Sequence, residues 1–140
     1  MPHPINPNTP RIYLAGPDVF LANAHAIGEA KCEICSARGL KGVFPLDGAL
    51  DLEGLAPAEQ ARRISLANEE LMRSCDAIIA NMTPFRGVSM DSGTAFEVGF
   101  MRALGRHVFA YSNAASEYAD RARAVRANGL PAGDFDAPGV

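Results

Sequence analysis

The sequence predicts one doubly wound α/β domain of the Rossmann or flavodoxin type, in which helices cover both faces of a parallel sheet. Short, almost purely apolar runs alternate along the chain with stretches whose apolar residues recur every three or four positions. The runs contain no alternating polar residues, which is typical of parallel strands buried on both faces. The chain has 140 residues, of which 48% are hydrophobic, so it can bury a core without metal or disulfide cross-links.

The first strand is expected at residues 12–15, where an apolar run ends in a glycine-proline pair. A helix over residues 20–37 should follow, because Gly39 stands where a helix-terminating glycine belongs and apolar residues recur at helical spacing. The stripe that they form is Phe20, Ala24, Ile27, Ala30, Ile34 and Ala37. A second short strand is expected at residues 43–46.

The second half of the chain repeats this alternation. Pro57 suits the first turn of a helix expected over residues 57–75, and Asn68 interrupts its apolar stripe. The most strand-like run of the chain is residues 77–80. The remaining expected elements are a helix over 94–104, a strand over 107–111 and a weaker helix over 114–127.

The folded domain is expected to cover residues 11–127. Four prolines in residues 1–10 predict an extended leader, and glycines and prolines predict a loose tail over residues 128–140. The longest apolar stretches are far shorter than the ~20 residues of a membrane span, and the N-terminus lacks the pattern of a signal peptide. We therefore expect a cytoplasmic protein without a membrane partner.

The charge distribution argues against a nucleic-acid partner. The chain has 13 Lys and Arg residues against 16 Asp and Glu residues, for a net charge of −3, and no basic cluster. A duplex or an anionic membrane surface would need such a cluster. A small molecule or a second copy of the chain is the better expectation.

The three cysteines, Cys32, Cys35 and Cys75, are too few and odd in number for a disulfide framework. The spacing of Cys32 and Cys35 is also found in redox and metal sites. The pair falls inside a helical pattern, however, and no second Cys/His pair lies at zinc-site spacing. Ordinary reduced thiols are the simpler interpretation.

The motifs of several common chemistries are missing. No G-x-G-x-x-G, P-loop or G-x-S-x-G pattern occurs, which disfavours dinucleotide, nucleoside triphosphate and serine-hydrolase chemistry. The three histidines, His3, His25 and His107, are scattered over a leader, a helix and a strand. No cofactor and no metal are therefore expected, and carboxylate chemistry remains.

Polar residues gather at one edge of the predicted sheet, where ligands of doubly wound folds bind. Among them, Asp91 and Glu97 lie at and just inside a helix start, so they can face one pocket from different depths. The positive end of the helix would keep Glu97 ionised and usable as a nucleophile. Alternatively, Thr94 and Glu97 have the spacing of a capping box, in which Glu97 would only cap the helix and Asp91 would be a solvated loop acid.

Five segments together resemble the nucleoside 2-deoxyribosyltransferases. They are Ile-Tyr-Leu-Ala-Gly-Pro at residues 12–17, Phe-Pro-Leu-Asp at 44–47, Cys-Asp-Ala-Ile-Ile-Ala-Asn at 75–81, Phe-Arg-Gly at 85–87 and Asp-x-Gly-Thr-x-x-Glu-x-Gly at 91–99. The last is the most specific. The resemblance extends in order over residues 11–112.

The resemblance implies a retaining double displacement on a 2′-deoxynucleoside. Glu97 would attack the anomeric carbon and hold the sugar until a free nucleobase displaces it. Asp91 would bind the 5′-hydroxyl, and the phenol of Tyr13 would orient the nucleophile. A 2-deoxy sugar supports the oxocarbenium-like transition state because it lacks the electron-withdrawing 2′-hydroxyl.

The resemblance also implies residues for base recognition. Phe20 would offer a ring face to the base, Asp47 would lie near it, and Asn68 would contact the base or another site residue. Some relatives have an acid at the position of Asn68 and a glutamine at that of Ala49. The other residues expected to bind substrate are Gly16, Asn81, Arg86 and Gly93.

Three hypotheses about function follow from the sequence. The first is base exchange by a homo-oligomeric transferase, because relatives complete their site with a neighbouring subunit. The second is hydrolysis of 2′-deoxynucleoside 5′-monophosphates, which Arg86, Ser89 and Ser92 would suit and Asp91 would disfavour by repelling phosphate. The third is a nucleotide-sensing module without chemistry, in which Glu97 would only cap a helix.

Overall fold

A four-stranded parallel sheet forms the centre of the computed structural model, which describes residues 8–45 and 50–128. Its strand order is β2-β1-β3-β4, so the order reverses at β1, where β2 and β3 lie on opposite sides. Ile12 of β1 is in register with Gly42 of β2 and with Ala77 of β3. The strands are β1 (Arg11–Ala15), β2 (Lys41–Val43), β3 (Ala77–Asn81) and β4 (His107–Tyr111).

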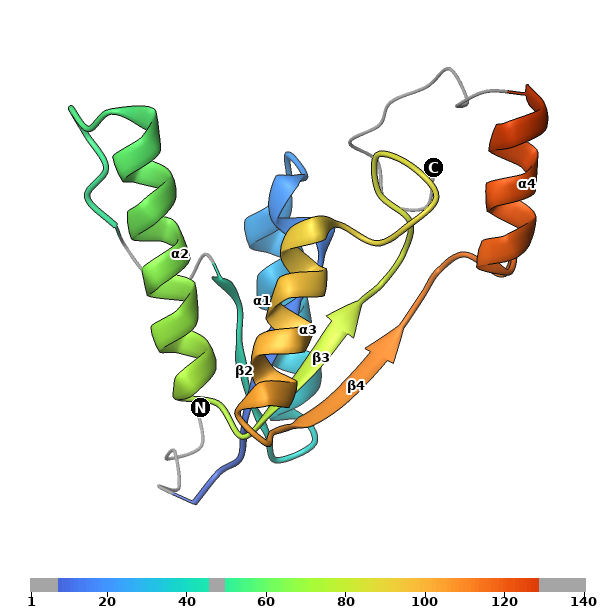
Figure 1. Ribbon diagram of the computed structural model, residues 1–140. Coiled ribbons are helices and arrows are strands. Elements are labelled where there is room, and N and C mark those ends of the chain that lie inside the picture. Colours follow the sequence, from blue (N-terminus) through green and yellow to red (C-terminus); the bar gives the residue numbers. More distant parts are fainter. Residues whose placement is uncertain (1–7, 46–49, 129–140) are drawn as a thin grey trace.

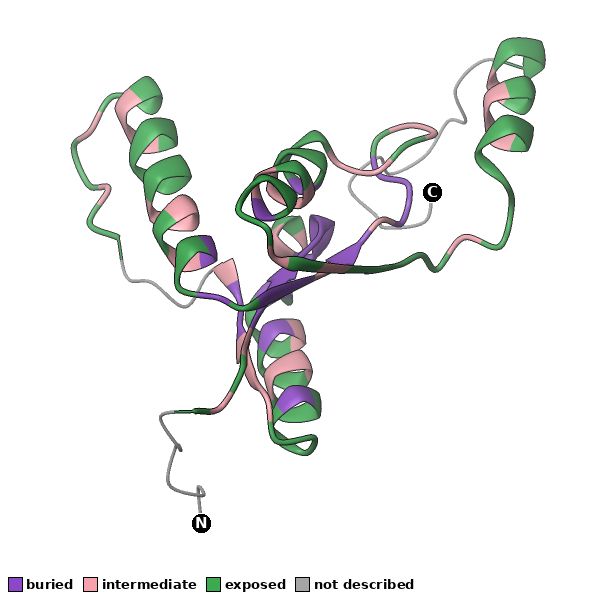
Figure 2. Cartoon of the chain, turned by 60° about the horizontal axis from the view of Figure 1, so that its bottom comes forward, coloured by how far each residue is buried: buried purple, intermediate pink, exposed green. Residues whose placement is uncertain are grey.

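Helices cover both faces of this sheet, which confirms the predicted doubly wound fold (Figures 1 and 2). One face packs against α1 (Ala24–Ser36), and the other packs against α3 (Ser92–Ala103) and the end of α2 (Pro57–Arg73). A short 3-10 helix, η1 (Pro17–Phe20), follows β1. The last helix, α4 (Tyr118–Asn128), stands beside the sheet and has no buried residue. None of the helices in residues 8–45 and 50–128 combines the length and apolar character needed to cross a bilayer.

The two sides of β1 supply both halves of the core. Ile12 and Leu14 point toward α1, together with Phe44, whereas Tyr13 and Ala15 point toward α2 and α3. The alternation follows from the period of two along a strand. Tyr13 is fully buried, so any polar partner of its hydroxyl must come from inside the protein.

The prediction of one helix over residues 20–37 is wrong in two respects. The segment is split into η1 and α1, and the side chains of Phe20 and Ile34 are 49% and 55% exposed. The buried face of α1 instead contains Gly28, where an added Cβ would lie 2.5 Å from the Phe44 ring. Ala24 of the expected stripe is buried on this face, but helical spacing did not mark Gly28, because a glycine has no apolar side chain.

The second strand also lies earlier than expected. It covers Lys41–Val43, not residues 43–46, and Pro45 has no N–H for a strand ladder. Leu46 lies outside the described residues. Helical spacing places Ile64 on the apolar stripe expected along residues 57–75, but Ile64 is 42% exposed, because α2 (Figure 2) contacts the sheet mainly through its C-terminal end around Met72.

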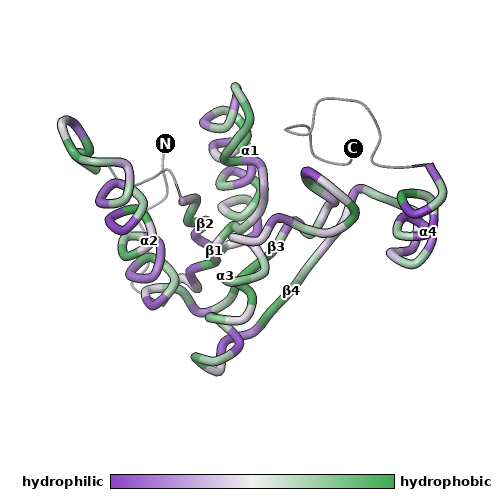
Figure 3. Tube along the Cα trace, turned by 45° about the horizontal axis from the view of Figure 1, so that its top comes forward, coloured by the Kyte–Doolittle hydropathy of each residue, from purple (hydrophilic) through white to green (hydrophobic). Residues whose placement is uncertain are grey.

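The last strand is confirmed at residues 107–111, but it is not a buried strand. Although β4 is mostly apolar (Figure 3), most of the strand is exposed (Figure 2), and Phe109 is 58% exposed. The third strand and the helix after it match the prediction to within one or two residues at each end, and α4 begins four residues later than expected. The predicted leader and tail fall largely outside the described residues.

Candidate active site

A cavity of about 300 Å³ opens at the carboxyl end of β1, beside the point where the strand order reverses. This is the location at which doubly wound folds bind ligands. The cavity lies between the turn after β1, the middle of α2 and the start of α3. Its lining residues are Gly16, Val19, Phe20, Pro45, Ile64, Asn68, Asp91, Gly93 and Glu97.

Glu97 and Tyr13 form the central pair of the site. Glu97 comes from the second turn of α3 and lines the cavity, whereas Tyr13 comes from β1 and is fully buried. The Tyr13 hydroxyl donates a hydrogen bond of 2.8 Å to Oε1 of Glu97. The capping-box alternative is therefore wrong, because Glu97 accepts a bond from a strand tyrosine and does not turn back to the helix start.

Burial raises the pKa of Glu97 to about 7, and the negative charge of nearby Asp91 acts in the same direction. The hydrogen bond from Tyr13 acts in the opposite direction, because it stabilises the carboxylate. Burial also raises the pKa of Tyr13, and its contact with Glu97 adds to that effect. The phenol thus remains a hydrogen-bond donor, and the carboxyl group titrates close to neutrality.

Asp91 caps α3. Its Oδ2 accepts hydrogen bonds from the backbone N–H of Thr94 at 3.0 Å and from the Thr94 hydroxyl at 3.3 Å. Its Oδ1 has no hydrogen bond to the part of the chain that the structure describes, and the residue lines the cavity. Asp91 is therefore neither a purely solvated acid nor a purely structural cap, since one oxygen is left to meet a ligand.

Phe20 reaches the cavity as part of an aromatic stack. Its ring lies parallel to that of Phe85, with an interplanar angle of 11° and 5.3 Å between centroids. The Arg86 guanidinium lies over both rings, 4.8 Å from the Phe85 centroid and 5.3 Å from that of Phe20. Arg86 has a left-handed backbone, with φ of 52°, which is uncommon outside glycine. These contacts hold the Phe20 ring in place beside the cavity.

Two glycines allow close approach at the cavity wall. Gly16 has φ of 153°, and a Cβ there would lie 2.7 Å from Cβ of Asn81 and 2.8 Å from Oδ2 of Asp18. At Gly93, a Cβ would meet Oδ2 of Asp91 at 3.0 Å. A side chain at either position would displace the turn after β1 or the cap of α3.

The predicted substrate-binding residues are brought together only in part. Asn68 is half-buried and lines the cavity, as do Gly16, Phe20 and Gly93. Arg86 does not line it but lies at a neighbouring cavity of about 330 Å³. Asn81 is turned away into a buried network, and Asp47 lies outside the described residues.

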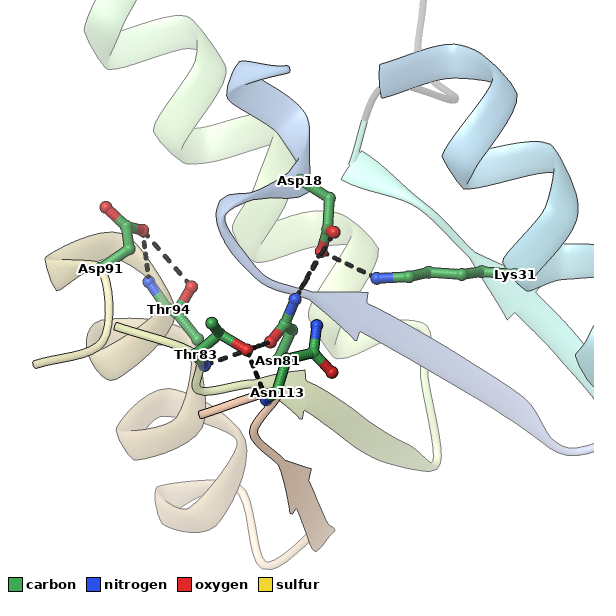
Figure 4. Close-up of polar contacts among 7 residues, drawn as sticks. All are labelled: Asp18, Lys31, Asn81, Thr83, Asp91, Thr94 and Asn113. Carbon is green, nitrogen blue, oxygen red and sulfur yellow. Dashed lines mark hydrogen bonds and ion pairs between the residues drawn. The ribbon is translucent and has the colours of Figure 1, made fainter. Parts of the chain in front are cut away.

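Sequence analysis missed several residues near the cavity. Val19 lines it and is marked by no local pattern. Pro45 and Ile64 also line it, although the first was expected only as part of the Phe-Pro-Leu-Asp segment and the second only as part of an apolar helix stripe. No sequence pattern marks the ion pair between Asp18 and Lys31 (Figure 4).

The cysteines and other metal-ligating side chains suggest no further site. Cys32, Cys35 and Cys75 form no disulfide bond, and burial raises the pKa of Cys35 and Cys75. Within residues 8–45 and 50–128, no three His, Cys, Asp or Glu side chains are grouped so as to hold a metal ion.

Comparison with known proteins identifies the family. The sequence profile of the nucleoside 2-deoxyribosyltransferase family matches residues 12–138, which is most of the chain. The chain belongs to this family. The match confirms the resemblance to this family that the sequence motifs indicate, and it covers the residues 91–99 that contain Asp91 and Glu97.

Individual relatives agree with the nucleoside 2-deoxyribosyltransferase assignment. A 2-deoxyribosyltransferase from Leishmania mexicana is 30% identical, with a TM-score of 0.65 over 92% of this chain and 77% of that chain. A 2-deoxyribosyltransferase from Bacillus psychrosaccharolyticus is 20% identical and shares the fold, with a TM-score of 0.62 over 76% of this chain and 75% of that one.

A curated relative in sequence is the uncharacterized protein C191.05c of Schizosaccharomyces pombe. It is 38% identical over 119 residues, which cover 84% of this chain and 56% of that protein. The chain thus spans about half the length of the curated relative that it matches.

Proposed function

We propose that the protein exchanges the base of 2′-deoxynucleosides, with Glu97 as the nucleophile that holds the deoxyribosyl group. The observation that carries this proposal is the pair of Glu97 and Tyr13, in which a half-buried carboxylate lines a ligand-sized cavity and accepts a hydrogen bond from one fully buried phenol. A carboxylate used only for helix stability would be turned toward the helix start.

The proposed reaction has two matched displacements. An oxygen of Glu97 forms a bond to C1′ of the sugar while the C1′–N bond breaks, and the leaving base keeps the bonding electrons and takes a proton from water. A nitrogen of a second base then attacks C1′, the bond from C1′ to Glu97 breaks, and the nitrogen gives its proton to water. Two inversions give overall retention. Tyr13 acts throughout by holding Oε1, which leaves the other oxygen of Glu97 for C1′.

Two further groups fit the two ends of a nucleoside. Oδ1 of Asp91 is available to accept a hydrogen bond from the sugar 5′-hydroxyl. On the base side, the ring of Phe20 offers a stacking face and the amide of Asn68 offers hydrogen bonds. An amide cannot donate a proton to the leaving base as an acid can, so base binding is the role that suits Asn68.

Hydrolysis of 2′-deoxynucleoside 5′-monophosphates is the second candidate function. It is favoured by the cavity of about 330 Å³ next to the first, whose lining includes Arg86, Ser89 and Ser92. These side chains could bind phosphate, whereas Asp91 lines both cavities and would repel it. The location of Asp91 therefore favours the transferase.

The test is a product assay. The protein is mixed with 2′-deoxyinosine and free adenine, and the products are separated by chromatography. Formation of 2′-deoxyadenosine supports base exchange. In a parallel reaction with 2′-deoxyinosine 5′-monophosphate, release of deoxyribose 5-phosphate supports the hydrolase, as does free deoxyribose from the nucleoside. A covalent deoxyribosyl mass on the Glu97 peptide would support the nucleophile directly. If neither 2′-deoxyinosine nor its 5′-monophosphate gives a product, both functions are contradicted.

A further inference from the structure

A second polar cluster lies at the carboxyl ends of β1, β3 and β4 (Figure 4). Its centre is Asp18 of η1, which is 7% exposed and forms a 2.7 Å ion pair with Nζ of Lys31 in α1. The Asn81 amide nitrogen lies 3.2 Å from Oδ2 of Asp18 and donates to it. The cluster thus joins a helix, a strand end and the turn that carries the cavity wall.

The cluster continues to the end of β4. Oδ1 of Asn81 accepts hydrogen bonds from the backbone N–H and the hydroxyl of Thr83, at 3.1 and 2.5 Å. The Thr83 hydroxyl oxygen in turn accepts a bond of 2.9 Å from the backbone N–H of Asn113. Asn81 and Thr83 are almost completely buried, so these bonds have little competition from water.

Asp18 depends on Lys31 for its burial. A carboxylate removed from water is costly unless a cation or several donors compensate it. Within the described part of the chain, Lys31 is the cation paired with Asp18. Burial works against the charge on Lys31, but its contacts with Asp18 and Tyr111 outweigh this effect and raise the pKa of the ammonium.

Asp18 belongs to the same turn as the cavity wall. It lies between Gly16 and Phe20, and both of these residues line the cavity with Val19. The fit is tight, because a Cβ at Gly16 would lie 2.8 Å from Oδ2 of Asp18. If Asp18 moved outward to reach water, this turn and the ring of Phe20 would move with it.

We propose that Lys31 is a positioning residue for the nucleoside site, which acts through Asp18 to hold the turn at residues 16–20 against the cavity. Lys31 itself does not line the cavity that contains Glu97. Tyr13 lies on β1 and Glu97 on α3, so neither belongs to the turn at residues 16–20. Loss of Lys31 should therefore weaken ligand binding more than it slows the chemical step. The kinetic test of this proposal rests on the proposed base exchange, whereas the hydrogen-exchange test does not.

The first arm of the test is kinetic. Lys31→Met keeps an apolar stem but leaves Asp18 buried without its cation, and the KM for 2′-deoxyinosine should rise about tenfold with kcat within about twofold. Lys31→Arg keeps a cation at this position and should have the KM of the wild type. The double variant Asp18→Asn with Lys31→Met should also restore it to within about threefold, because a neutral amide needs no cation. Arg123→Met, which removes an exposed ion pair to Asp120 on α4, is the matched control and should not change KM.

The second arm needs no activity. Hydrogen exchange measured by mass spectrometry should show faster exchange in the peptide over residues 16–24 of Lys31→Met, by about tenfold, including the Leu21 N–H that is bonded to the Asp18 carbonyl. Lys31→Arg and Arg123→Met should match the wild type there, and peptides of α3 should be unchanged in every variant.

Distinct outcomes separate the two proposals. An inactive wild type with the expected exchange pattern would contradict base exchange and leave the positioning role supported. Unchanged exchange in Lys31→Met, acceleration throughout the chain, or a double variant as impaired as the single one would overturn the positioning role. A fall in kcat at constant KM would also overturn it, since that is the result of a smaller folded fraction.

Discussion

Two carboxylates near the end of β1, Asp18 and Glu97, differ in how far neighbouring groups compensate their charge. Asp18 has an ammonium partner at 2.7 Å and an amide donor at 3.2 Å, so its charge is compensated. Glu97 accepts one hydrogen bond, from Tyr13, and has no cation among the residues that the structure describes; burial raises its pKa to about 7. A carboxylate with a cation and a hydrogen-bond donor stabilises structure, whereas a carboxylate without a cation has a raised pKa and is better suited to react.

The largest expected effect is the loss of Glu97. Glu97→Gln keeps the size of the side chain and its bond to Tyr13 but removes the nucleophilic charge, so base exchange should fall by about three powers of ten or more. Initial rates with 2′-deoxyinosine and adenine measure this. Glu70→Gln, at an exposed position of α2, is the matched control and should keep full activity. A folded Glu97→Gln protein with ordinary activity would show that Glu97 is not the nucleophile.

A smaller effect is expected when Tyr13 loses its hydroxyl. Tyr13→Phe removes the bond that lowers the pKa of Glu97, so the carboxylate should be both less well oriented and harder to ionise. We expect kcat/KM to fall by about 10- to 100-fold near neutral pH. In the wild type, kcat/KM should decline as pH falls below about 7, and in Tyr13→Phe this decline should begin at higher pH.

The pH profile of kcat/KM for both proteins decides this prediction. If the decline of the variant began at the same pH as in the wild type, or lower, Tyr13 would not stabilise the charged form of Glu97. Retention of the wild-type rate would show that the hydrogen bond at 2.8 Å has no part in orienting the nucleophile.

The undercompensated carboxylate should also cost stability. Because the pKa of Glu97 is raised from 4.5 to about 7 on folding, the folded protein binds more protons than the unfolded chain between these values. The free energy of unfolding contributed by this group therefore falls as pH rises from about 4.5 to 7. Glu97→Gln should be more stable than the wild type at pH 8 by about 2 kcal/mol, and the difference should shrink toward pH 4.5.

Urea unfolding of both proteins at pH 8, 6 and 4.5 measures this difference, with Glu70→Gln again as the control. A pH-independent difference would mean that Glu97 does not titrate as its burial implies. A less stable Glu97→Gln protein at pH 8 would contradict the comparison with Asp18, because it would show that the charge of Glu97 stabilises the fold.

The smallest expected effect concerns Asp91. Asp91→Asn retains a good N-cap for Thr94, so stability should change little, but the charge that faces the sugar end is lost. We expect kcat/KM for 2′-deoxyinosine to fall about tenfold and the preference for it over the 5′-monophosphate to narrow. Parallel kinetics with the two substrates measure both changes. If the wild type prefers the monophosphate, hydrolysis replaces base exchange as the better-supported function. Arg86, Ser89 and Ser92 then become the candidate phosphate-binding residues.

The parts of the fold that could be predicted from sequence depend on local patterns. Buried parallel strands are continuous apolar runs, so residues 77–80 were recognisable, and β4 was placed at residues 107–111. The buried face of α1 was predicted only in part: Ala24 of the expected stripe is buried, but Gly28, which packs against Phe44, has no side chain to mark it. The exposure of Ile64 depends on how far α2 extends past the sheet, which spacing does not express.

The sequence alone determined the doubly wound fold class and the set of polar residues at one sheet edge, because strand and helix periods are local and parallel strands end together. The block at residues 91–99 singled out Glu97 and Asp91 in the same way. Only the tertiary structure decided the surroundings of each carboxylate. Tyr13 is 84 residues from Glu97, and Asn81 is 63 residues from Asp18, so their hydrogen bonds exist only once β1 and β3 pair and α3 packs on them. Burial, which raises the pKa of Glu97, and the ion pair, which compensates Asp18, belong to that packing and have no signature along the chain.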